Sequence, residues 1–244
     1  MTALNRKLLS NLWQMKSQVL AIALVMASGV AVFVMSQATL TSLRLTQETY
    51  YERYRFADIF SHLRRAPDSV KARIEEIPNV SRVQTRVVED VILDIADFAE
   101  PVVGRILGIP AGDSQGLNQL YLRKGRLIEA GRDREVVVHE AFAEAHALQP
   151  GATISAILNG HKEQLHVVGI VLSPEFVYAI RPGELLPDDR RFGVLWMGQK
   201  ELAAVFDLEG AFNDVSLAVT PNAIEQEVIR RLDDILARYG GTGA

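Results

Sequence analysis

The feature that most constrains this chain is an apolar run near its N-terminus. Residues 17–43 contain no Asp, Glu, Lys, Arg or His. The densest part, residues 19–35, would rise roughly 25 Å as an α-helix, which approaches the thickness of a bilayer's hydrocarbon core. Nine of its residues are Val, Leu, Ile or Phe, so its insertion is expected to be favourable by about 3 to 5 kcal/mol. We therefore predict a transmembrane helix over residues 19–43.

Charge sets the expected orientation of this helix. Arg6, Lys7 and Lys16 precede the run, and no acidic residue does. The positive-inside rule then places the N-terminus in the cytoplasm and the residues after about 43 outside a bacterial inner membrane, in the periplasm. Leucines at helical spacing beside these cations predict an interfacial helix over residues 1–18. A cleaved signal peptide is the alternative, because residues 36–38 offer small side chains near a cleavage position.

Composition excludes several classes of protein. The chain has no cysteine, which rules out a disulfide framework and a thiolate metal site. Its net charge of −4 includes the three N-terminal cations, so the rest of the chain is more acidic than the whole. An acidic domain argues against binding to nucleic acid, which requires clustered cations.

Hydrophobic periodicity predicts an α+β fold for the remainder. The helix is expected to continue as a stalk to about residue 56, because residues 37–56 contain no Pro or Gly. A strand "ADIFSHLRRAP", a short helix capped by Asp68 and a strand "VSRVQTRVVEDVILDI" follow, and near the C-terminus the strand "NDVSLAVT" precedes a helix starting at Pro221. We predict a split β-α-β (ferredoxin-like) membrane-proximal subdomain with stalk, from residues 44–95 and 211–244.

The residues between these halves, 96–210, predict an inserted, mainly β subdomain. The stretch "EVVVHEAFAEAHAL" indicates a buried strand followed by a short helix. Asn159-Gly160 is the strongest turn signal in the chain and predicts a β-hairpin. The stretches "RRFGVLWM" and "KELAAVFD" predict a further strand and a short helix.

His139 and His146 raise the hypothesis that a helix in this segment binds zinc. His139 and His146 are seven residues apart, or roughly 10.5 Å along a helix, whereas two nitrogens bound to one zinc ion lie at most about 4 Å apart. We interpret His139 as the residue that ends a strand and starts a helix. The other histidines, His62, His161 and His166, lack metal-ligand spacing. Asp188-Asp189, beside two arginines, indicates a solvated loop.

No phosphate-binding loop and no nucleophile elbow occur in the sequence. We therefore expect a protein that is not an enzyme, and we assign no catalytic residue, no cofactor-binding residue, no metal ligand and no cofactor.

The order of the motifs resembles the permease subunits of ABC transporters of the FtsX/MacB-like superfamily. The resemblance lies in "LNRKLLSNLWQMKSQVLAIALVMASGVAVFVM", Gly125-Arg126, the strand and helix of residues 136–147, Pro150-Gly151, and "VVGIV" at 167–171. It implies a first transmembrane helix followed by a two-part MacB-like periplasmic core domain, with later spans absent from this sequence. It also implies a separate ABC ATPase subunit, a second permease copy or half, membrane lipid and a periplasmic adaptor as partners, and no nucleic acid.

The resemblance implies a function as well. The chain would be a truncated permease subunit that couples ATPase movements to the extracytoplasmic domain, for export or release of hydrophobic or lipid-like substrates. Two alternatives remain: a periplasmic binding module or hydrolase with a signal peptide, and a membrane-fusion-type adaptor.

Overall fold

The computed structural model describes residues 16–95, 98, 100–110 and 116–241. The chain forms two units, Met1–Tyr50 and Tyr51–Ala244. The interfacial helix expected over residues 1–18 lies, for residues 1–15, outside the described part of the chain.

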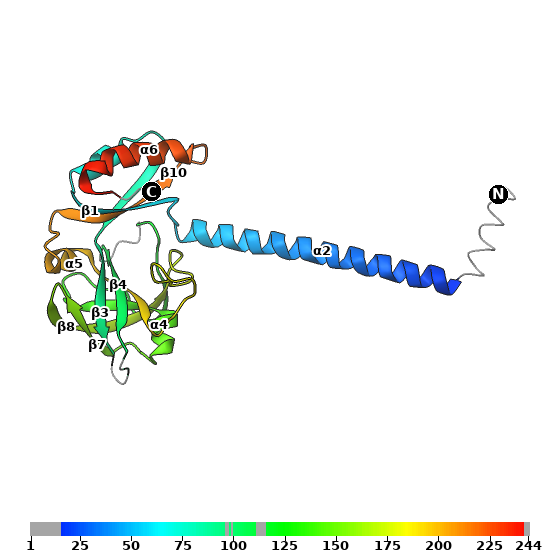
Figure 1. Ribbon diagram of the computed structural model, residues 1–244, viewed down its shortest axis with the longest axis horizontal. Coiled ribbons are helices and arrows are strands. Elements are labelled where there is room, and N and C mark those ends of the chain that lie inside the picture. The colour runs from blue at the N-terminus through cyan, green and yellow to red at the C-terminus, as the bar shows by residue number, and fades with distance from the viewer. Residues whose placement is uncertain (1–15, 96–97, 99, 111–115, 242–244) are drawn as a thin grey trace. The chain divides into compact units, whose positions relative to one another are not determined.

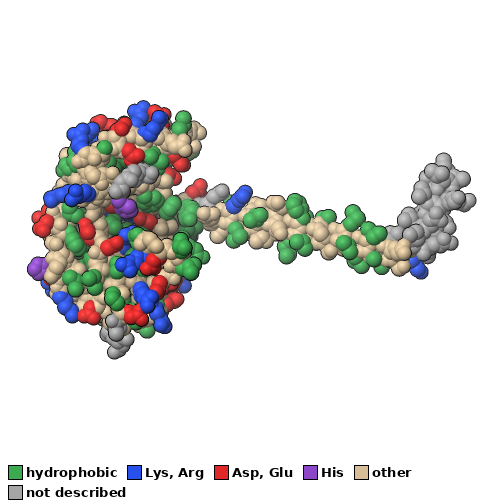
Figure 2. All heavy atoms as spheres, in the orientation of Figure 1, with side chains coloured by type: hydrophobic (Ala, Val, Ile, Leu, Met, Phe, Trp, Pro, Cys, Tyr) green, Lys and Arg blue, Asp and Glu red, His purple; other side chains and the backbone are tan. Residues whose placement is uncertain are grey.

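The first unit contains one long helix. α2 (Lys16–Arg53) has 38 residues, enough for a rise of roughly 57 Å, which exceeds the thickness of a bilayer core. Figure 2 shows no charged side chain along the middle of α2, where the large apolar side chains are more than half exposed. Within the described residues it is the one helix long and apolar enough to cross a membrane, a test that a signal sequence near an N-terminus also meets. The predicted span and its helical continuation thus lie in one element.

The hydroxyl groups of α2 bond to the helix's own backbone. Ser28 donates to the carbonyl of Val25, and Thr41, Thr46 and Thr49 each donate to the carbonyl four residues earlier, at 2.8–2.9 Å. A hydroxyl satisfied in this way needs no water, so these residues do not oppose an apolar environment.

The second unit begins with a three-stranded antiparallel sheet in the order β1-β10-β2. α6 covers one face of this sheet together with α3 (Figure 1). Val70, Ile74 and Ile77 are buried there, and Val228, Leu232 and Leu236 form the buried stripe of α6. The predicted split β-α-β arrangement is confirmed. Its elements are β1 (Ile59–Pro67), α3 (Val70–Glu75), β2 (Val80–Arg86), β10 (Ala211–Val219), α6 (Glu225–Leu236) and the 3-10 turn η1 (Ala237–Tyr239).

Two predicted helix starts were wrong. Ser69, not Asp68, occupies the N-cap of α3, and it makes no side-chain cap hydrogen bond. α6 begins at Glu225 rather than at Pro221, and Ile224 at its N-cap is exposed instead of lying on the buried face. Residues 221–222 form a turn, where the fixed φ of proline is equally suited.

The remaining strands form a seven-stranded sheet, six strands of which close into a ring, while the seventh, β5, pairs among the described strands only with β8. The order is β5-β8-β6-β9-β4-β3-β7, and β7 also pairs with β8. β8 closes the ring because it is long: its first half, to His166, pairs with β7, and its second half pairs with β6. The strands are β3 (Val88–Asp94), β4 (Val102–Ile109), β5 (Tyr121–Gly125), β6 (Glu135–His139), β7 (Thr153–Leu158), β8 (His161–Leu172) and β9 (Phe192–Gly198).

Both faces of the central strands are covered. Leu195 and Met197 of β9 pack in one core with the short helices α4 (Glu140–Ala145) and α5 (Gln199–Val205). Val194 and Trp196, on the other face, pack with Ile128 and with residues of the segment that joins β8 to β9. This burial on both faces explains why β6 and β9 are almost continuously apolar. The predicted β-rich insertion is therefore a small barrel.

The stretch predicted as one strand over "VSRVQTRVVEDVILDI" is two strands in different sheets. β2 ends at Arg86, Val87 is fully buried at the bend, and β3 pairs with β4 and β7 in the barrel. The alternation of apolar residues continues through the bend, because each strand buries one face. The hairpin at Asn159-Gly160 is confirmed, with φ angles of 46° and 81° that suit a type I′ turn.

Candidate functional site

A buried network of ion pairs joins the three-stranded sheet to the barrel subdomain. Its members, called here the ion network, are His62 of β1, Asp214 of β10, Arg86 of β2 and Glu175 from the segment between β8 and β9. The first three lie on the face of the sheet that the helices leave open. Glu175 reaches them from the barrel side, so the network spans the boundary between the two sheets.

Arg86 is the centre of the ion network. Its Nε donates to Asp214 Oδ1 at 2.5 Å, and its two terminal nitrogens donate to the two carboxylate oxygens of Glu175 at 2.6 and 2.7 Å. The side chain of Arg86 is 3% exposed and that of Asp214 0%. The planar guanidinium suits this task, because its fork of donors can hold two carboxylates in fixed directions.

His62 occupies the solvent end of the network. Its Nδ1 lies 2.6 Å from Asp214 Oδ2, while its side chain is 59% exposed. The hydrogen bond to Asp214 raises the pKa of His62 above its usual value, against the opposing effect of burial. Burial alone would raise the pKa of Asp214, but the charge of Arg86 and the hydrogen bond from His62 lower it. Asp214 is therefore ionised at neutral pH, and His62 is the network member able to titrate there.

A second group of contacts ties the network to the segment that follows α2. The carbonyls of Tyr54 and Arg55 accept hydrogen bonds from the backbone of Gln119 and Asn118, at 2.8 and 2.9 Å. The side chain of Asn118 accepts a bond from the Ala57 amide at 2.9 Å and donates to Glu175 at 3.1 Å. Asn118 thus contacts both the start of the folded domain and the ion network.

Asn213 of β10 makes a further tie between the sheets. Its side-chain amide bonds both backbone groups of Val88, the first residue of β3, at 2.8 and 2.9 Å. Val88 pairs with Leu107 of β4, and Asn213 satisfies the backbone N–H and C=O of Val88, which are partly buried. Asn213 also donates to Glu89 at 2.9 Å.

A small crevice opens beside the ion network. Its volume is about 190 Å³, and its charged lining is His62, Arg86, Arg105 and Glu175. Three phenylalanines, Phe56, Phe60 and Phe176, form much of the apolar lining. The crevice brings solvent to His62 without opening the core.

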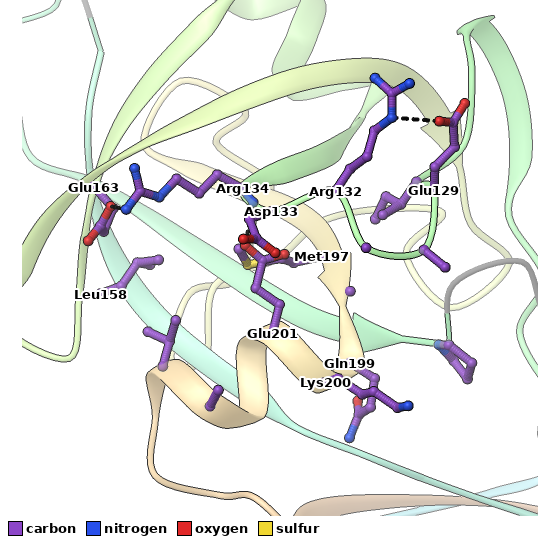
Figure 3. A pocket seen from close by; sticks show the side chains of 17 residues that line it. Glu129, Arg132, Asp133, Arg134, Leu158, Glu163, Met197, Gln199, Lys200 and Glu201 are labelled. Atoms are coloured by element: carbon purple, nitrogen blue, oxygen red, sulfur yellow. Dashed lines mark hydrogen bonds and ion pairs between the residues drawn. The ribbon is translucent and has the colours of Figure 1, made fainter.

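A larger cleft of about 870 Å³ lies on the barrel. Figure 3 shows the arginines at its edge turned toward acidic partners: Arg132 bonds Glu129 at 2.7 Å and Arg134 bonds Glu163 at 3.0 Å. Glu201 accepts a hydrogen bond from the Arg134 backbone. The cleft therefore has an apolar floor, which includes Leu158 and Met197, and a rim whose arginines are already paired.

The histidines singled out in the sequence do not meet. His139 ends β6 at the start of α4, as predicted, and is 3% exposed. His146 ends α4 and bonds the carbonyl of Arg190 at 2.9 Å. Among the residues that the structure describes, no group of three His, Asp or Glu could hold a metal ion. Asp188 accepts hydrogen bonds from the backbone of Arg190 and Arg191 and forms an ion pair with the Arg191 side chain at 3.6 Å, so its charge is offset within this loop.

The sequence did not reveal the ion network. Arg86 is 128 residues from Asp214 and 89 from Glu175 along the chain, so no local motif relates them. The one available signal was the charge at the end of an otherwise half-apolar strand.

Comparisons with known proteins concern the fold. No family model and no curated protein matches the chain. The extracellular domain of the noncanonic ABC-type transporter YknZ from Gram-positive bacteria is similar, with 15% identity over 76% of this chain and 97% of that chain and a TM-score of 0.47. The periplasmic region of MacB from Actinobacillus actinomycetemcomitans is similar with 14% identity over 72% of this chain and 76% of that chain, and the TM-score is 0.44. A domain of a putative permease protein from Porphyromonas gingivalis is similar with 12% identity over 73% of this chain and 71% of that chain, and the TM-score is 0.40.

The first of these structures is described as part of an ABC-type transporter and the third as part of a putative permease. With identities of 12–15% and TM-scores of 0.40–0.47, we draw no conclusion about activity from these likenesses.

Proposed function

We propose that this chain is the first membrane span and extracytoplasmic domain of an ABC transporter permease subunit. Its task would be mechanical: to pass movement of the span to the outer domain, for export or release of hydrophobic or lipid-like substrates. The class of transporter comes from the order of the sequence motifs. The mechanical role is supported by one structural observation, the hydrogen-bonded path from Arg55 through Asn118 to Glu175 and Arg86.

This path suits the transmission of movement because it is short and because Asn118 and Arg86 are buried. The backbone of residues 54–57 is held at three points by residues 118–119. Asn118 then contacts the one carboxylate, Glu175, that the barrel subdomain contributes to Arg86. A displacement of the segment after α2 would therefore reach the boundary between the sheets through fixed hydrogen bonds rather than through a flexible loop.

The proposed partners follow from the same role. A separate ATPase subunit would supply the movement in the cytoplasm, and a second permease copy or half would complete the transporter. A periplasmic adaptor would bind the outer domain. The proposed location is the bacterial inner membrane, with the residues after about 43 in the periplasm.

Single cysteines test the topology, since the chain has none of its own. His161→Cys, at the exposed start of β8 just after the hairpin turn, should react with a membrane-impermeant maleimide in intact spheroplasts. Thr2→Cys should react only after permeabilisation. Each labelled protein should stay in the membrane fraction at its full mass of 27.0 kDa. A shortened, soluble product with a new N-terminus near residue 39 would instead support the secreted alternative.

A further inference from the structure

The ion network is one charge short of balance. Asp214 and Glu175 contribute two negative charges, and Arg86 contributes one positive charge, so a neutral His62 leaves the group at about −1. Protonated His62 would bring it to neutrality. In a buried setting an uncompensated charge is costly, so the network favours proton uptake at its only solvent-exposed member.

The charged groups near His62 come from β10, β2, β4 and the segment between β8 and β9. Asp214 of β10 faces it directly, and Arg86 of β2 lies behind that carboxylate. Arg105 of β4 and Glu175 line the same crevice. Arg105 is itself paired with Asp90 at 2.8 and 2.9 Å, which offsets its repulsion of a second cation. The balance of these groups favours the imidazolium form.

We propose that His62 is a proton-operated latch on the boundary between the two sheets. Proton uptake strengthens the contact between His62 and Asp214. Asp214 then holds Arg86 in place, and this stabilises the ion pair between Arg86 and Glu175. Loss of the proton leaves the network with an unbalanced negative charge and loosens the boundary. The latch is a property of the folded unit, and it holds whether or not the chain serves a transporter.

The direction of the pH dependence follows by linkage. The pKa of His62 is raised in the folded protein, so the folded state binds the proton more tightly than the unfolded chain does. The stabilisation is complete below the unfolded value of about 6.5 and is lost as the pH rises through the higher folded value. The boundary should therefore be tighter in mildly acidic than in mildly alkaline solution.

Two measurements on the full chain in detergent micelles test the latch. Histidine-selective carbon-13 NMR should show His62 titrating above the ordinary histidine value of about 6.5, with its signal assigned by means of the His62→Gln variant. Hydrogen exchange, corrected for the intrinsic effect of pH, should be several-fold slower at about pH 5.5 than at about pH 8 in peptides covering β2 and β10.

The variant His62→Gln separates the latch from a general effect of pH. Glutamine can still donate a hydrogen bond to Asp214 but does not titrate, so the pH difference in exchange should disappear. His161→Gln, the matched control, should keep it. The latch is excluded if His62 titrates at or below about pH 6.5, or if His62→Gln retains the difference in exchange. A raised titration without any change in exchange would equally overturn it.

Discussion

Arg86 pairs with two carboxylates at once, the buried Asp214 and the partly buried Glu175, so removing its side chain takes the arginine's positive charge away from both. We expect Arg86→Met to lower the free energy of unfolding by about 3–5 kcal/mol, the usual cost of breaking a buried ion pair from one side. Urea unfolding of the full chain in detergent, followed by tryptophan fluorescence, measures the change.

Arg231→Met is the matched control for that substitution. Arg231 is half exposed and pairs with Glu227 one turn away at 2.8 Å. Exposed pairs of this kind contribute about 0.3–0.5 kcal/mol. Equal losses for the two variants would show that the ion network adds no more than a surface pair.

His139 and His62 affect the stability of the fold in opposite directions as the pH changes. The His139 ring is buried near Trp196, and neither of its ring nitrogens makes a hydrogen bond of good geometry. The nearby backbone of Phe176 favours the protonated ring, but this effect is smaller than that of burial. Burial lowers the pKa of His139 below 6.5. Its neutral form therefore suits the fold above that pH, and stability falls as the pH drops below it.

The variant His139→Leu should remove this sensitivity to acid. We expect its advantage over the unmodified chain to be larger at about pH 5 than at about pH 7.5, because a buried imidazole is no longer forced to stay neutral. Thermal unfolding at the two pH values measures it, with His161→Leu at an exposed site as the control. A constant difference at both pH values would contradict the assignment.

At the scale of elements, local patterns such as turns and strands could be predicted from the sequence, but the sheet to which each strand belongs could not. The Asn159-Gly160 hairpin was predicted because its geometry depends on two adjacent residues that accept positive φ. The break between β2 and β3 was missed, because period-two alternation records which side chains are buried and not the sheet to which a strand belongs. The contact that fixes this break comes from Asn213, 125 residues away.

Close packing between β9 and α4 gives a prediction for a single strand. A Cβ at Gly193 would lie 2.7 Å from ring atoms of Phe142, which is itself fully buried. We expect Gly193→Ala to lower the free energy of unfolding by about 1–3 kcal/mol, the usual cost of overpacking a core. Chemical unfolding compares it with Gly198→Ala, where a Cβ would lie 3.7 Å from the flexible side chain of Glu201. Similar values for the two would contradict this account of the packing.

At the scale of the whole molecule, the sequence indicated the order of parts better than the way they are joined. The apolar helix is a long run without charged residues, and the split β-α-β layer and the β-rich insertion bury side chains in a periodic pattern, so each could be predicted. The boundary between the sheets is built from single charged and amide side chains on distant segments, such as Asn118 and Glu175. Such contacts leave no period in the sequence, and only the fold brings them together.

If Glu175 fastens the barrel to the three-stranded sheet, its loss should let the two move relative to each other. Spin labels on Asp234→Cys of α6 and His161→Cys of the hairpin would report the distance between the subdomains in the otherwise cysteine-free chain. We expect a narrow distance distribution in this labelled protein and a broader one after Glu175→Ala, because Arg86 then keeps only its bond within the sheet. Glu140→Ala, which breaks the more exposed pair with Arg123 inside the barrel subdomain, should leave the distribution unchanged. If Glu175→Ala also leaves it unchanged, the apolar contacts around the crevice hold the boundary by themselves, and the path through Asn118 cannot be the route by which movement reaches the barrel.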